Sequence, residues 1–152
     1  MLLKRRKVRK LSSLSSVITD TYGESLSTEV PLEVLRDRLL KDLSLLDLPV
    51  GEVDLSLRPY SKTYYGNYFP DDVVPRVWLY PYSDEGGRYL SYDKILETGI
   101  HEMCHHIQYS DPDFKRKRGV MHDPQFWKLY NHYIKRAVSM KLLGEKYVKQ
   151  AI

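Results

Sequence analysis

Residues 91–112 read SYDKILETGIHEMCHHIQYSDP, and the segment HEMCH at positions 101–105 decides how the rest of the chain is interpreted. Apolar side chains recur around this segment at helical spacing. Ser91 is suited to cap a first helical turn, and Pro112 prevents the helix from continuing. The sequence therefore predicts a helix over about residues 92–109.

The two histidines of this segment lie four positions apart, on one face of the predicted helix. Their Cβ atoms would be about 6 Å apart, so the imidazoles of His101 and His105 can converge on one metal ion. Glu102 points beside the pair, where its carboxylate can reach a metal-activated water without being a ligand. A different face carries the predicted core side chains, which are Leu96, Ile100, Met103 and Ile107.

Three other residues of the helix need an interpretation, two from the direction of their side chains around the helix axis and Gly99 from its low helix propensity. His106 lies about 100° around the helix from His105, so we expect it outside the ligand set. Cys104 flanks the core face and is predicted to be a small buried hydrophobe. Gly99 is unfavourable inside a helix, which suggests that a neighbouring element packs closely against it.

A catalytic zinc site usually has three protein ligands and one position left to water, so a third ligand must come from elsewhere. His122 is the preferred candidate, because Asp123 and Pro124 are suited to begin another helix directly after it. A rigidly placed side chain makes a better ligand. His132, further along that helix, and an unidentified carboxylate remain the alternatives.

The remaining patterns predict an α+β domain with about three helices and about three short strands. Leucines at three- and four-residue steps predict a first helix, and they are Leu32, Leu35, Leu39, Leu43 and Leu46. Strict alternation over residues 52–58 predicts a strand with one buried face. Aromatic and β-branched residues predict short strands over 64–69 and 76–80, and bordering prolines favour edge positions for both. A further helix is expected to begin near Pro124 and to end by Gly144.

The positive charge of the chain is unevenly distributed. The formal net charge is +4, but residues 1–19 contain six lysines and arginines and no acidic residue, which leaves a slightly acidic body. We expect residues 1–27 to form a basic, flexible tail and residues 28–152 to form a single domain. The tail and a second basic segment at 115–118 are candidate DNA contacts, and solvated chain is the alternative for both. The tail could also be a nuclear address or, less favoured, a mitochondrial presequence.

Length and composition restrict the class of protein. A chain of 152 residues fits one domain, and its single cysteine excludes an internal disulfide framework. No apolar stretch approaches the length that a membrane span needs, and no apolar segment of a secretory signal follows the N-terminal basic residues. These features predict a protein without membrane contact that is intracellular, either cytoplasmic or nuclear in a eukaryotic host.

The combination of motifs resembles one family. HEMCHH, followed seventeen residues after His105 by His122 in HDPQFWKLY, resembles the SprT-like (Spartan-type) zinc metallopeptidases over about residues 30–140. The chain does not contain the cysteine-rich zinc ribbon that some members carry after the protease domain. The resemblance implies a zincin-like minimal metalloprotease fold, with a small mixed or antiparallel sheet beside the HExxH helix. It also implies one Zn²⁺ bound by His101, His105 and His122, with Glu102 as the catalytic base.

The expected function is hydrolysis of peptide bonds by a zinc-dependent endopeptidase acting on proteins or peptides. DNA-associated proteins are one candidate substrate class. The strand at residues 76–80 is expected to lie at a sheet edge and to bind an extended substrate by strand addition. The alternative is a non-enzymatic module in which zinc stabilises a small fold that binds nucleic acid or protein.

Overall fold

The computed structural model describes residues 30–70, 73–115 and 119–150, together with three short N-terminal strands at residues 2–4, 17–19 and 25–27. The remainder of the predicted basic tail lies outside the described residues. So do Arg116, Lys117 and Arg118 of the second basic segment. Their predicted contact with DNA stays a prediction.

The three helices expected from the sequence are present, with two shorter helical segments. The long helices are α1 (Leu32–Leu45), α2 (Tyr92–Ser110) and α3 (Pro124–Ser139). A 3₁₀ turn η1 (Val50–Glu52) follows α1, and a short helix α4 (Lys146–Gln150) follows α3. Helix α3 ends before Gly144, because the backbone turns at Lys141, whose φ is 61°. None of the helices in the described residues is both long and apolar enough to cross a membrane.

Among the described residues the main sheet contains four strands, one more than the sequence predicted. They are β1 (Leu2–Lys4), β4 (Asp54–Leu57), β5 (Tyr64–Phe69) and β6 (Arg76–Leu79). Their spatial order is β1-β5-β6-β4, in which β4 and β6 are parallel and the other pairs antiparallel. The sheet is therefore mixed. Strands β2 (Val17–Thr19) and β3 (Ser25–Ser27) form a separate antiparallel pair.

The expectation that residues 64–69 and 76–80 form edge strands is wrong for both, because β5 lies between β1 and β6. Strand β6 lies between β5 and β4, so both of its sides are paired. Pro75 and Pro81 lie just outside the strand, so the hydrogen bonds within the strand are not interrupted by their missing N–H groups. The two prolines are therefore compatible with a central position. Strands β1 and β4 form the edges. Strand β1 also places part of the predicted flexible tail in the sheet.

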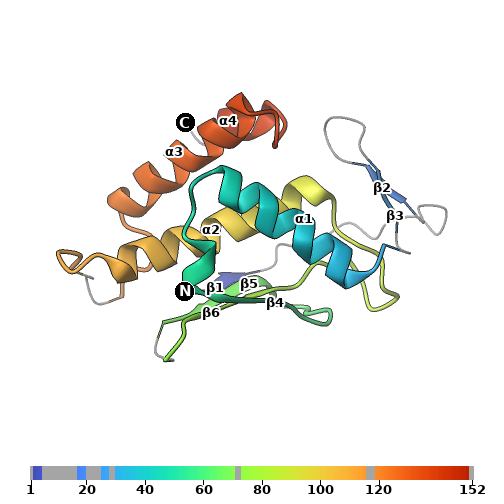
Figure 1. The fold of residues 1–152 in the computed structure, drawn as a ribbon, viewed down its shortest axis with the longest axis horizontal. Coiled ribbons are helices and arrows are strands. Elements are labelled where there is room, and N and C mark those ends of the chain that lie inside the picture. The colour runs from blue at the N-terminus through green and yellow to red at the C-terminus, as the bar shows by residue number, and fades with distance from the viewer. Residues whose placement is uncertain are drawn as a thin grey trace.

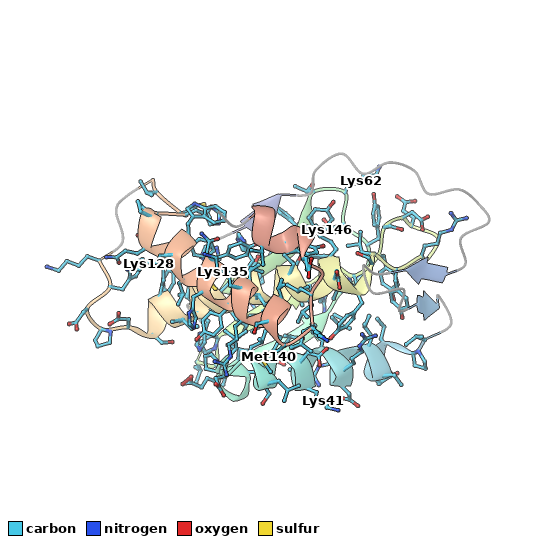
Figure 2. The ribbon with its side chains drawn as sticks, turned by 90° about the horizontal axis from the view of Figure 1, so that it is seen from above. Lys41, Lys62, Lys128, Lys135, Met140 and Lys146 are labelled. Carbon is cyan, nitrogen blue, oxygen red and sulfur yellow. The ribbon has the colours of Figure 1, made fainter. Side chains whose placement is uncertain are left out.

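Helix α2 lies in the middle of the molecule, between the sheet and α3 (Figure 1). Helix α1 packs beside it, and the Cβ of an alanine at Gly99 would lie 3.5 Å from Leu43 Cδ1, which is ordinary packing distance. Helix α1 therefore packs against Gly99 as expected, but at a distance that would also accept alanine, so the packing does not require a glycine there. The outer face of α3 is polar, with exposed Lys128 and Lys135 along it (Figure 2).

Candidate metal centre

The central position of α2 buries an unusual number of polar side chains. Burying a polar group is unfavourable unless it gains a partner, so each such group needs a reason to be there. The buried polar side chains lie in two segments of the helix, from Asp93 to Thr98 and from His101 to Gln108. The buried polar residues of α2 are Asp93, Glu97, Thr98, His101, Glu102, His105, His106 and Gln108.

Three histidines converge beside this helix. His101 and His105 lie on α2, and His122 lies in the segment before α3. The Nε2 atom of His122 lies 3.1 Å from His101 Nε2 and 3.2 Å from His105 Nε2. In tetrahedral zinc sites with Zn–N bonds of about 2.0–2.1 Å, neighbouring nitrogens are roughly 3.3–3.4 Å apart. The cluster can hold a metal ion, and both distances to His122 are close to this spacing.

The structure distinguishes between the two histidines that the sequence offered as the third ligand. One ligand atom from each of His101, His105 and His122 falls within 4.8 Å of the others, and these three form the only such group among the described residues. His132 is exposed on α3 and lies outside the group. The preference for His122 rested on the helix start that follows it, and that helix begins where expected.

Burial keeps these imidazoles in the form that binds metals. In the metal-free protein, burial lowers the pKa of His101 to about 3, and the nearby imidazole of His122 acts in the same direction. Burial also lowers the pKa of His122, although the carboxylate of Asp123 opposes this effect. Neutral imidazole nitrogen is the form that coordinates zinc, so a metal need not displace protons from these two side chains near neutral pH.

Aromatic side chains support the histidines. The fully buried ring of Phe126 is nearly parallel to the ring of His105 at 4.5 Å, and its centroid lies 5.0 Å from that of His101 and 4.8 Å from that of His122. Trp127 contacts His122 at 5.5 Å between centroids, while 43% of its side chain remains exposed. Phe126 therefore packs against all three rings and limits their rotation.

The segment that carries His122 is fixed to α2 by hydrogen bonds. Asp123 caps α3, and its Oδ1 accepts a hydrogen bond of 2.7 Å from the backbone N–H of Phe126. The same oxygen accepts a hydrogen bond of 3.3 Å from Nε2 of Gln108 on α2. Gln108 thus links the two elements that supply the metal ligands. The sequence indicated the cap but gave no signal for Gln108.

Glu102 differs from every other buried acid of α2. Its side chain is fully buried, and neither carboxylate oxygen has a hydrogen-bond partner among the described residues. It does not belong to the group of metal-ligating atoms. Burial raises its pKa well above the usual range in the metal-free protein. A fully desolvated carboxyl group with no protein partner suggests contact with something other than the chain itself.

Gly66 on β5 allows this carboxyl group to sit where it does. A Cβ atom at Gly66 would lie 2.9 Å from Thr98 Cγ2, 3.0 Å from Glu102 Cγ and 3.1 Å from Glu102 Oε1. A side chain at position 66 would require Thr98 and Glu102 to shift, whereas glycine lets β5 approach α2 without such a shift. Gly66 was not predicted as a site residue from the sequence. The available signal was a glycine inside an aromatic strand, which often marks a close backbone approach.

The other buried polar residues of the helix each have at least one protein partner, although Asp93 Oδ1 has no hydrogen-bond partner among the described residues. His106 faces β5, where its Nδ1 lies 2.7 Å from the hydroxyl of Tyr68, and it is not among the clustered histidines. Glu97 accepts hydrogen bonds from Tyr130 of α3 at 2.7 Å and from Lys94 at 3.2 Å. Cys104 is buried in the core, as expected, and burial raises the pKa of its thiol.

Comparison of the chain with protein-family models, with curated proteins and with solved structures gave no match.

Proposed function

We propose that this protein is a zinc-dependent endopeptidase of the SprT-like type, with a zincin-like fold. The observation that carries the proposal is Glu102, a fully buried carboxyl group without a protein partner, one residue after a member of a three-histidine cluster. This combination suits hydrolysis, in which a metal and a general base act on the same water molecule. The motif spacing that resembles the SprT-like family supports the same conclusion.

The histidine cluster suits a catalytic site for zinc. His122 lies at close to tetrahedral spacing from both His101 and His105, and the cluster includes no fourth His, Cys, Asp or Glu among the described residues. Three protein ligands with a position left to water are typical of catalytic zinc, whereas structural zinc normally has four protein ligands. A bound zinc ion would lower the pKa of a water molecule and polarise the carbonyl group of the scissile bond.

The residues of the chain then have separate tasks. His101, His105 and His122 hold the ion, and Phe126 restricts the orientation of their rings. Glu102 accepts the proton of the attacking water and transfers it to the nitrogen of the leaving amine. Gly66 leaves room for the carboxyl group to do this without contact from a side chain of β5.

The alternative is a zinc-stabilised module without catalysis, acting through nucleic-acid or protein binding. A merely structural site gives no reason to bury an acid without a partner, because such burial is unfavourable and could be relieved by a glutamine or an apolar residue. The two functions differ in what they require of Glu102. Catalysis needs its carboxylate, whereas a zinc-stabilised module needs only the histidines.

Replacement of Glu102 by glutamine tests the proposal. Hydrolysis of unfolded β-casein and zinc content would be measured for the parent chain and for Glu102→Gln, with Glu145→Gln at an exposed acid as the matched control. We expect one zinc per chain in all three proteins, and a loss of hydrolysis of about 10²–10⁴-fold only in Glu102→Gln. Full hydrolysis by zinc-loaded Glu102→Gln would contradict the mechanism. Zinc binding without hydrolysis in the parent chain would favour the structural module.

A further inference from the structure

Strand β5 is the part of the sheet closest to Glu102. Gly66, near its middle, would meet the side chain of Glu102 at 3.0–3.1 Å if it carried a Cβ atom. Tyr68 of the same strand reaches His106, one turn further along α2. Strand β5 therefore follows α2 across the candidate active site, and a peptide backbone paired with the side of β5 opposite β6 would pass beside the same carboxyl group.

The two sides of β5 are not equivalent. One side pairs with β6 inside the sheet, from Gly66 opposite Leu79 to Phe69 opposite Arg76. Without β1, the sheet would end at the other side of β5. The backbone of β1 pairs with this side in antiparallel orientation. Leu3 is opposite Gly66, and Leu2 is opposite Asn67. The N-terminal strand is thus paired with the part of β5 that lies beside Glu102.

We propose that this side of β5 is the binding surface for an extended peptide substrate, and that residues 2–4 occupy it as an internal competitor. The inference rests on the proposed peptidase function. An exposed sheet edge binds extended peptides through main-chain hydrogen bonds, which makes such recognition tolerant of sequence. Because β1 uses the same main-chain groups of β5, the substrate and β1 exclude each other.

The pairing of β1 is suited to reversible competition. The strand has only three residues, and its register shifts between Leu3 and Lys4, so its ladder is short and irregular. Attachment to the same chain compensates for this weakness, because pairing within one chain takes place at an effective concentration that can reach about the millimolar range. A substrate with a longer regular strand can displace β1 by forming more hydrogen bonds with β5.

A binding experiment tests the competition without requiring catalysis. The probe is a fluorescein-labelled peptide with the sequence of residues 1–8, MLLKRRKV, added to zinc-supplied Glu102→Gln protein so that it is not cut. Leu3→Pro disrupts the pairing of β1, because proline removes an N–H and restricts the backbone. Ile18→Pro is the matched control, since β2 pairs with β3 and not with β5. A second variant lacks residues 2–4.

We expect Leu3→Pro and the variant lacking residues 2–4 to bind the probe at least about fivefold more tightly than the parent or Ile18→Pro, as removal of a tethered competitor requires. Equal affinity in all four folded proteins, with folding checked by circular dichroism, would overturn the inference. If either Leu3→Pro or the variant lacking residues 2–4 fails to fold, the comparison uses the other of these two variants.

Kinetics separate this inference from the proposed function. In chains that retain Glu102, loss of β1 pairing should lower the KM for a β-casein peptide several-fold and leave kcat unchanged. Hydrolysis with identical KM in the parent and in Leu3→Pro would leave the peptidase in place and refute the competition. Tighter probe binding without hydrolysis in any variant would refute the peptidase and retain the peptide-binding edge.

Discussion

Gly66 is the residue at which the sheet and the candidate active site meet. The nearest atoms to a Cβ placed there belong to Thr98 and Glu102, both on α2. Any larger residue must either separate β5 from α2 or move the carboxyl group. The position therefore links the fold directly to the chemistry, although Gly66 has no functional group of its own.

Gly66→Ala should impair both stability and hydrolysis. We expect a loss of about 1–3 kcal/mol in the free energy of unfolding, as for an overpacked core position, measured by urea denaturation. We also expect hydrolysis to fall at least about tenfold, since small displacements of a catalytic group are costly. Zinc content should stay at one per chain, because none of the three atoms nearest to a Cβ at Gly66 belongs to a histidine.

Gly51 supplies the control for that variant. A Cβ atom at Gly51 would meet no atom within 4 Å, so Gly51→Ala should leave both stability and hydrolysis near the parent values. Adding Thr98→Ser to Gly66→Ala removes the nearest methyl group and should recover stability more than activity, because the contacts with Glu102 remain. Normal activity in Gly66→Ala would show that the position of Glu102 is unimportant.

Phe126 is expected to determine how tightly the histidines bind metal. Phe126→Leu keeps an apolar side chain but removes the ring that packs against all three imidazoles, so the rings gain freedom that metal binding must restrict. We expect zinc affinity to fall by about tenfold, the size of effect seen for supporting residues around metal ligands, in competition with a zinc-binding dye. Phe69→Leu is the matched control, because Phe69 packs against Trp78 on the sheet.

Among the elements, helices could be predicted from the sequence more completely than strand neighbours. The leucine spacing of α1 and the caps at Ser91 and Asp123 are local signals, and both caps form the expected backbone hydrogen bonds. Strand β1 has three residues within a basic segment and pairs with a strand more than fifty residues away, so no local pattern identified it. The central position of β6 was missed for the same reason.

The start of α3 offers a test of how an element positions a ligand. Asp123→Ala and Ser91→Ala each remove an N-cap, and each should cost about 1 kcal/mol in stability, measured by thermal or urea unfolding. Only Asp123 also accepts the hydrogen bond from Gln108 and adjoins His122. Zinc affinity should therefore fall about tenfold in Asp123→Ala and little in Ser91→Ala. Equal affinities would show that the cap does not position His122.

At the scale of the whole molecule, a metal would join α2 to the segment before α3. Ligand binding to the folded state alone stabilises it by about 2.7 kcal/mol when the free metal is at 100 times its Kd. For a domain of this size that corresponds to roughly 5–10 °C in Tm. We therefore expect EDTA to lower the Tm of the zinc-loaded protein by this amount, and re-addition of zinc to restore it, in differential scanning fluorimetry.

The response to zinc should depend on His122 and not on His132. His122→Ala removes a member of the cluster, so its Tm should be nearly insensitive to EDTA. His132→Ala changes an exposed residue of α3 and should keep the full response. A zinc-dependent Tm in His122→Ala equal to that of the parent chain would exclude His122 as a ligand.

The candidate site could be predicted only where its geometry is local. The convergence of His101 and His105 follows from the period of a single helix, and His122 was indicated by the helix start beside it. The contributions of Gly66 and Gln108 depend on which elements pack against α2. That information is distributed over the whole chain and could not be obtained from any one segment.

The histidine cluster also has a consequence for the order of folding. His101 and His122 are 21 positions apart, whereas β1 must close a much longer loop to reach β5. Short loops close at lower entropic cost, so α2, α3 and the segment between them can associate before the sheet is complete. Zinc present during synthesis would then select this helical pair as a folding nucleus, and the N-terminal strand would be added last.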